Sequence, residues 1–273
     1  MSDAPWAKLE AKPRRTFSKP PIALVIAQIQ YPAQAEFSNS GVSARFHSEI
    51  KELFPETRQV TGFSVELTLQ ADFESSGLSS FATPVTTQFY DPSQAWLAAL
   101  AEDSLTLECR DYPGFEEFQA RFSLLMRALS RIAQVAPLRR LGLRYINEAR
   151  GTDFPARQVA SSQIAGVQEH AVLARHLVAS HQLLRYDVAS TQVNLQHGYF
   201  PTGTTVMPVS GGSPTDDFYL LDIDVSREFV TDDIRFLDTG ALVNLSQEFH
   251  DIASALFRWA ISDDYESYLG GEE

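Results

Sequence analysis

The sequence predicts an α+β fold in which antiparallel or mixed sheets, arranged in two halves, each pack against one long amphipathic helix. Strand patterns come in runs and do not alternate regularly with helices, which favours antiparallel pairing over a doubly wound parallel sheet. Two long apolar stripes recur at helical spacing, one after residue 114 and one after residue 238. Each stripe supplies one half with the helix that covers its sheet.

The first half begins after the prolines at residues 20–21. Its β-branched runs and apolar–polar alternations predict strands over residues 22–31, 63–69, 85–90, 104–110 and 138–149. Apolar residues at helical spacing also predict a helix over 42–54, which Pro55 ends. A longer helix starts after Gly114, and its stripe comprises Phe115, Phe118, Phe122, Leu125, Leu129 and Ile132. An aromatic stripe at this spacing is more typical of a helix packed across a sheet than of a ligand platform.

The second half follows a connector, residues 151–181, whose helical pattern is weak. Two apolar runs predict strands over 183–195 and 217–226, and they flank a loop over 199–215 that is rich in Gly, Pro and Ser. The final helix starts at residues 238–239, and its stripe comprises Leu242, Leu245, Phe249, Ile252, Leu256, Phe257 and Ala260. Ser262 then begins a last short turn.

These patterns predict one globular domain over residues 20–269, with sub-halves 20–150 and 182–269 on either side of the connector. Residues 1–19 are polar, contain prolines and lack apolar periodicity, which predicts a flexible leader, and residues 270–273 form a short tail. The leader holds a dense basic cluster of Lys8, Lys12, Arg14, Arg15 and Lys19.

Composition limits the classes of partner. Of 273 residues, 44% are hydrophobic and 21% are charged, as in folded globular chains, and the formal net charge is −13. Nucleic-acid binding needs clustered Lys and Arg, so we do not expect it except through the basic leader. No apolar run approaches the roughly 18 residues of a membrane span, and no signal-peptide pattern is visible. We therefore expect a cytoplasmic protein without membrane contact, whose partner is a protein or a small molecule.

The motifs that define common enzyme families are absent. The sequence has no phosphate-binding loop, no dinucleotide-binding glycine pattern, no nucleophile elbow and no zinc-protease helix. Its one cysteine, Cys109, lies in an alternating apolar run, which favours a buried, inert thiol over a nucleophile. His170, His176 and His181 match the spacing of a helical zinc site only weakly. We therefore expect no metal and no other cofactor.

Two carboxylates are the first candidates for chemistry. Asp222 and Asp224 are two residues apart in a predicted strand, so both side chains point to one face. Such a pair can hold a divalent cation or act as acid and base, and it is also typical of a solvated strand face.

Three residues of the strand over 138–149 are further candidates. Arg144 can hold an anionic ligand with both arms of its guanidinium group, or it can pair with surface carboxylates. Tyr145 and Asn147 continue the apolar face of the strand, where a polar group must find a partner. Asn147 therefore either satisfies a buried group or marks the mouth of a pocket.

Four stretches of the chain carry a resemblance. They are residues 20–32, the string Gly142-Leu143-Arg144-Tyr145-Ile146-Asn147, residues 221–224 and residues 249–262. Over residues 20–269 the chain resembles a sporadically distributed prokaryotic family of unknown function, and the Gly-Leu-Arg-Tyr-Ile-Asn string is the most specific part. The resemblance implies no catalytic residues. The patchy distribution of that family implies a role linked to mobile elements or defence.

Taken together, these features predict a non-catalytic binding or interaction protein rather than an enzyme. Its partner would bind in a groove between sheet and long helix or on an exposed surface. The alternative is a small-ligand-binding protein or metal-dependent enzyme whose pocket is lined by Arg144, Tyr145, Asn147, Asp222 and Asp224.

Overall fold

The computed structural model describes residues 5–9, 16–34, 37, 40–60, 86–133, 135, 137–204, 215–229 and 238–272. The expected strand over 63–69 and most of the loop over 199–215 lie outside the described residues.

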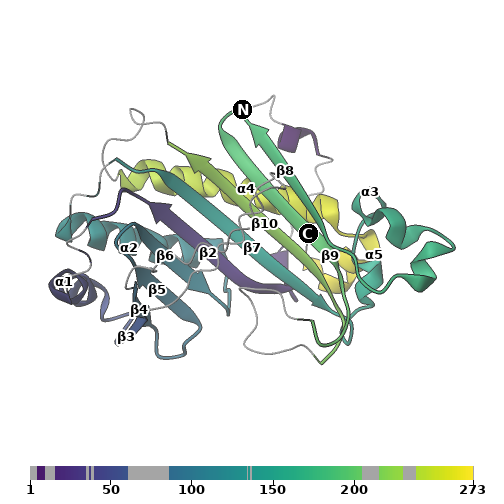
Figure 1. The fold of residues 1–273 in the computed structure, drawn as a ribbon, viewed down its shortest axis with the longest axis horizontal. Coiled ribbons are helices and arrows are strands. Elements are labelled where there is room, and N and C mark those ends of the chain that lie inside the picture. Colours follow the sequence, from purple (N-terminus) through teal and green to yellow (C-terminus); the bar gives the residue numbers. More distant parts are fainter. Residues whose placement is uncertain are drawn as a thin grey trace, which may run out of the picture.

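Among the described residues, nine strands form one antiparallel sheet in the order β3-β4-β5-β6-β2-β7-β10-β9-β8 (Figure 1). In chain order the strands are β2 (Ile22–Gln30), β3 (Glu56–Val60), β4 (Thr86–Tyr90), β5 (Trp96–Leu100), β6 (Ser104–Cys109), β7 (Arg140–Arg150), β8 (Gln182–Val188), β9 (Thr191–Phe200) and β10 (Phe218–Glu228). The predicted α+β class with antiparallel pairing is confirmed. The sub-halves expected over 20–150 and 182–269 contribute to the same sheet, because β7 pairs with β10 along its whole length.

Helices α1 (Ser40–Ile50), α2 (Phe115–Ile132) and α4 (Thr239–Ala260) lie on one face of this sheet (Figure 1). Helix α2 packs against α1, β6 and α4, whereas α4 packs against β7 and β10. The predicted apolar stripes form the core between these layers, and Phe122 and Phe249 are at most 1% exposed. Every second residue of each central strand therefore faces the helices, and its neighbours face the other side.

The predicted starts of the last two helices are confirmed, and each carries a side-chain cap. Asp238 accepts a hydrogen bond from the Ala241 amide at 3.1 Å at the start of α4. Ser262 accepts one from the Tyr265 amide at 3.2 Å and begins α5 (Asp263–Leu269).

The single strand predicted over 183–195 is wrong, because the chain reverses there between β8 and β9. Ala189 and Ser190 have φ values of 50° and 68°, which fits the two-residue turn that right-twisted strands favour. Such turns usually use Asn or Gly, so an Ala–Ser pair gives no turn signal. Strand β3 was also missed, because all five of its residues are exposed and it lacks an apolar alternation. Strand β5 was missed as well, because its sequence, Trp-Leu-Ala-Ala-Leu, is apolar throughout and shows no alternation.

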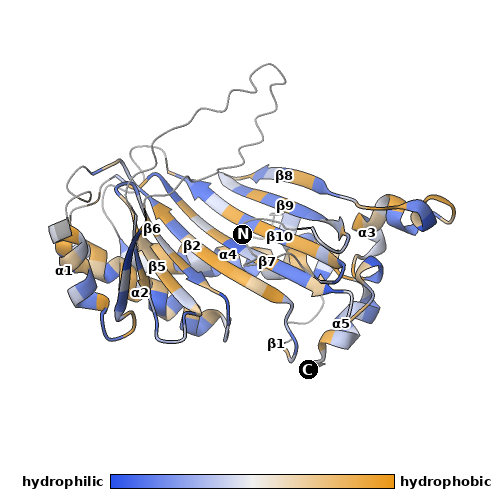
Figure 2. Ribbon diagram, turned by 60° about the horizontal axis from the view of Figure 1, so that its bottom comes forward, coloured by the Kyte–Doolittle hydropathy of each residue, from blue (hydrophilic) through white to orange (hydrophobic). Residues whose placement is uncertain are grey.

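The connector consists of short helical turns, η3 (Ala156–Gln158), α3 (Ser162–Ala165), η4 (Gly166–Glu169) and η5 (Leu173–His176). It projects beyond the end of the sheet, where Figure 2 shows apolar residues among polar ones.

Described parts of the leader contact the body of the protein. The short helix η1 (Pro5–Lys8) places the Trp6 ring 6.1 Å from Tyr186, edge to face. Strand β1 (Thr16–Phe17) pairs with β11 (Gly271–Glu272), and the Phe17 ring lies 5.8 Å from Phe257. The leader and the tail therefore form a second, two-stranded sheet.

In the described part of the chain, no helix combines the length and the apolar character needed to span a bilayer.

Candidate functional site

The five residues predicted to line a pocket lie on two faces of the sheet. Arg144, Asp222 and Asp224 point away from the helices, and Asp224 stands directly opposite Arg144 in the pairing of β7 with β10. Tyr145 and Asn147 point toward the helices. The predicted sharing of faces holds, but the sheet separates the two groups, so the five do not meet in one site.

Arg144 and Asp222 form a close ion pair on the face that points away from α1, α2 and α4. The guanidinium donates from Nε at 2.8 Å and from Nη2 at 2.6 Å to the two carboxylate oxygens. The Asp222 side chain is 4% exposed, whereas that of Arg144 is 29% exposed. Burial raises the pKa of Asp222, and the hydrogen bonds from Arg144 oppose this rise.

A second ion pair lies beside the first. Arg140 Nη2 is 3.2 Å from Asp224 Oδ2, and Asn194 Nδ2 is 3.5 Å from the same oxygen. Arg140 reaches Asp224 across Gly142, where a Cβ atom would lie 2.6 Å from the Arg140 guanidinium. The missing side chain of Gly142 therefore leaves room for the Arg140 guanidinium.

Each of the two carboxylates is thus paired with an arginine, which balances its charge. Among the described residues, no group of three or more His, Cys, Asp or Glu side chains is placed to hold a metal ion. A ligand role for Arg144, Asp222 or Asp224 stays a prediction.

On the helix-covered face, Tyr145 and Asn147 make internal contacts. The Tyr145 hydroxyl lies 2.8 Å from His250 Nδ1 and 3.4 Å from the Tyr112 hydroxyl. The His250 ring stacks on Phe115 at 4.1 Å, so this cluster joins α2 and α4 to β7. Asn147 donates to the Leu221 carbonyl at 2.9 Å, which satisfies its buried amide.

The cysteine and histidine candidates have local roles. Cys109 is fully buried, as predicted, and burial raises the pKa of its thiol to about 12, which disfavours the reactive thiolate. His170 Nδ1 accepts hydrogen bonds from the Val172 and Leu173 amides, whereas His181 packs on Phe200.

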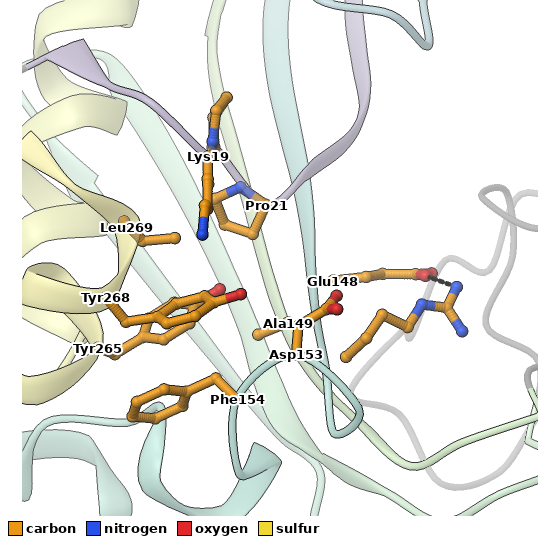
Figure 3. A pocket seen from close by; sticks show the side chains of 11 residues that line it. Lys19, Pro21, Glu148, Ala149, Asp153, Phe154, Tyr265, Tyr268 and Leu269 are labelled. Carbon is orange, nitrogen blue, oxygen red and sulfur yellow. Dashed lines mark hydrogen bonds and ion pairs between the residues drawn. The ribbon is translucent and has the colours of Figure 1, made fainter.

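A cleft of about 380 Å³ opens where the end of the leader, the end of β7 and α5 meet (Figure 3). Its aromatic wall consists of Phe154, Tyr265 and Tyr268. The Phe154 ring lies 5.0 Å from that of Tyr265 and 5.3 Å from that of Tyr268. The two tyrosine rings stack 6.1 Å apart at 15°. Sequence reasoning missed this cleft, and its only local signal is two tyrosines three residues apart on a short helix.

Lys19 reaches into the cleft from the leader. Its Nζ lies 5.1 Å from the centroid of the Tyr268 ring, and Figure 3 shows the side chain directed at the tyrosines. Its backbone amide donates to the Leu269 carbonyl at 3.1 Å, and that of Ser18 donates to Gly270 at 3.0 Å. Gly270 has a φ of 67° and leaves room for Ser18, whose Oγ would lie 2.5 Å from a Cβ atom there. The leader is thus fastened to the end of α5.

Carboxylates line the opposite side of the cleft. Glu148 is 3% exposed in its side chain and pairs with Arg150, and burial raises the pKa of this carboxyl. Asp153 lies near the tyrosine hydroxyls in Figure 3. Burial raises the pKa of Tyr265, and the charges of Tyr268 and Asp153 raise it further. The cleft therefore combines aromatic rings with two carboxylates, beside the cationic side chains of Lys19 and Arg150.

Comparisons with known protein families, curated proteins and solved structures found no match to this chain. The resemblance to a sporadically distributed prokaryotic family stays a prediction.

Proposed function

We propose that the protein is a non-catalytic binding protein whose ligand carries an organic ammonium group, and that the cleft beside α5 is its binding site. One observation carries this proposal: the chain's own ammonium group, that of Lys19, already lies over an aromatic ring of the cleft. The cleft is thus complementary to a cation of this kind.

The electrostatics of the cleft support a cationic ligand. The faces of aromatic rings carry negative charge, and a cation near such a ring gains about 0.5–2 kcal/mol. Asp153 adds a carboxylate, whereas the Glu148 carboxylate is already paired with Arg150. A second cation can therefore be held between Asp153 and the tyrosine rings once Lys19 moves aside.

The size of the cleft suits a small ligand or a single side chain of a larger partner. Ligand pockets commonly span about 300–1,000 Å³, and this cleft lies at the lower end of that range. The cleft draws on the end of the first sub-half, on the start of the connector and, through α5, on the second sub-half.

The proposal can be tested with a charged ligand and its neutral isostere. We expect choline to bind the full chain in a calorimetric titration and 3,3-dimethylbutan-1-ol, which has the same shape without the charge, not to bind. Lys19→Ala should bind choline about tenfold more tightly, because an internal competitor with a high effective concentration is removed. Asp153→Asn should weaken binding, whereas Asp103→Asn, on a carboxylate outside the cleft, should not.

Equal binding of choline and the neutral isostere would overturn the proposal. Unchanged or weaker choline binding by Lys19→Ala would also overturn it, since Lys19 would then not compete for the site.

A further inference from the structure

The strand β8 forms one edge of the sheet, and among the described residues it pairs only with β9. From Leu183 to Val188 its residues alternate between exposed and partly buried positions. Leu184 and Tyr186 pack toward the helices, while Leu183, Arg185 and Asp187 lie on the other face. An edge strand with free backbone groups is a template for pairing with another strand.

The charges on this edge are opposite and two residues apart. Arg185 and Asp187 are exposed and share a face of β8. Arg185 donates to Gln192 at 2.9 Å, and neither residue forms an ion pair with any other described residue. An antiparallel copy of the same strand would carry the complementary charges.

We infer that β8 pairs with β8 of a second copy of this chain, antiparallel and centred on Tyr186. This register places Arg185 opposite Asp187 of the second copy, and Asp187 opposite its Arg185. The result is an isologous interface, in which two-fold symmetry forms each contact twice. The nine-stranded sheet would then continue into the second copy.

The charges select this register from its neighbours. Centring the pairing on Arg185 would place two guanidinium groups opposite each other, and centring it on Asp187 would oppose two carboxylates. Like charges directly opposite are destabilising, whereas opposite charges stabilise a strand pair.

The backbone is compatible with the same register. The turn closes between Val188 and Thr191, and hydrogen-bonded and non-hydrogen-bonded pairs alternate from there along the hairpin. This alternation directs the amides and carbonyls of Leu183, Arg185 and Asp187 away from β9. In the proposed register these outward groups meet each other, as an antiparallel ladder requires.

The other edge strand, β3, does not present unpaired opposite charges of this kind. On β3, Arg58 already pairs with Glu56 of the same strand at 3.3 Å and lies over the Tyr90 ring. Because Arg58 and Glu56 already pair within one chain, charge complementarity does not favour pairing of β3 with a second copy.

Most of the exposed apolar residues in the described chain lie in the connector or on β8, whereas β3 carries one, Val60, at 37% exposure. Of the six large hydrophobic residues exposed in the described chain, five fall between residues 167 and 183, and Val178 is 74% exposed. Exposed apolar residues concentrated in one segment can mark an interaction surface. Apolar contact beside the strand pair would add to the dimer's stability.

Sedimentation equilibrium over a concentration series tests the inference. We expect the wild-type chain to reach the dimer mass, and Arg185→Asp and Asp187→Arg each to weaken dimerisation by about tenfold or more, because each creates two like-charge pairs. Arg58→Asp on the other edge is the matched control and should leave the dimer intact.

The decisive measurement mixes the two variants. An Arg185→Asp chain presents two acidic side chains and an Asp187→Arg chain two basic ones, so the mixture should form a dimer that neither forms alone. A variant that has merely misfolded cannot produce this result. A monomeric wild type, an unaffected single variant, or a mixture that stays monomeric would each overturn the inference.

Discussion

Asp222→Asn tests how much the ion pair at the centre of the sheet stabilises the fold. Removing one member of a buried ion pair costs about 3–5 kcal/mol, because the other charge loses its partner. The Arg144 side chain keeps 29% of its exposure, so water can solvate part of its charge. We therefore expect a loss of about 2 kcal/mol in the free energy of unfolding.

Asp224→Asn is the matched comparison. Asp224 and Arg140 are each 23% exposed in their side chains and meet at 3.2 Å. A pair this accessible to water is worth about 0.5–1 kcal/mol. The two variants change the same group on the same strand, so the difference between them isolates the effect of burial and of the bidentate contact.

Urea denaturation followed by circular dichroism measures both losses, and an unchanged m-value would show that both variants unfold from a similar native state. The double variant Arg144→Met, Asp222→Leu should be less destabilised than Asp222→Leu alone, because no unpaired charge is left. If Asp222→Asn and Asp224→Asn lose the same small amount, the buried pair does not stabilise the protein as argued. A rise in melting temperature with Mg²⁺, Mn²⁺ or Ca²⁺ that both variants abolish would instead support a metal site at these carboxylates.

Three further predictions concern the core, the β8–β9 turn and the response to pH. Phe122→Ala should cost about 3–5 kcal/mol in a denaturant titration, as for other buried phenylalanines, and a near-neutral result would contradict the core role of α2. The double variant Ala189→Asn, Ser190→Gly should raise stability by about 0.5–1 kcal/mol, since both positions have positive φ; a loss would argue against this turn. Burial lowers the pKa of His197 below its ordinary value of 6.5. At pH values just below 6.5 the unfolded chain therefore binds more protons at this histidine than the folded chain does. Stability should therefore fall as pH drops through this range, and His197→Gln should flatten the decline; an unchanged slope would exclude His197 as its source.

Local patterns predicted the long helices and most of the strands that bury one face, but not β5. Helices α2 and α4 follow from apolar stripes and from a cap at Asp238, all of which are encoded within a few residues. Strand β3 is an exposed edge and therefore has no apolar face to reveal it. The order of strands in the sheet depends on contacts between distant segments, which periodicity does not contain.

For the candidate residues too, the sequence predicted local features but not contacts between distant segments. Alternation along β10 correctly placed Asp222 and Asp224 on one face, and alternation along β7 correctly placed Tyr145 and Asn147 together. It did not show that Arg144 would pair with Asp222, because that depends on the alignment of two strands far apart in the sequence. The cleft was harder still, since Lys19, Phe154 and Tyr268 come from three separate segments.

The two proposals together define a testable architecture. The cleft is lined by the ends of the leader and of β7 and by α5, whereas the inferred interface lies along β8, so pairing would leave the cleft of each copy open. A dimer would then carry two cation sites related by two-fold symmetry, and a partner with two ammonium groups at a matching separation would bind far more tightly than either site alone. Arg185→Asp should remove this gain and leave the affinity for choline unchanged, because Arg185 does not line the cleft. A change in choline affinity in this variant would show that the cleft and the β8 edge are coupled.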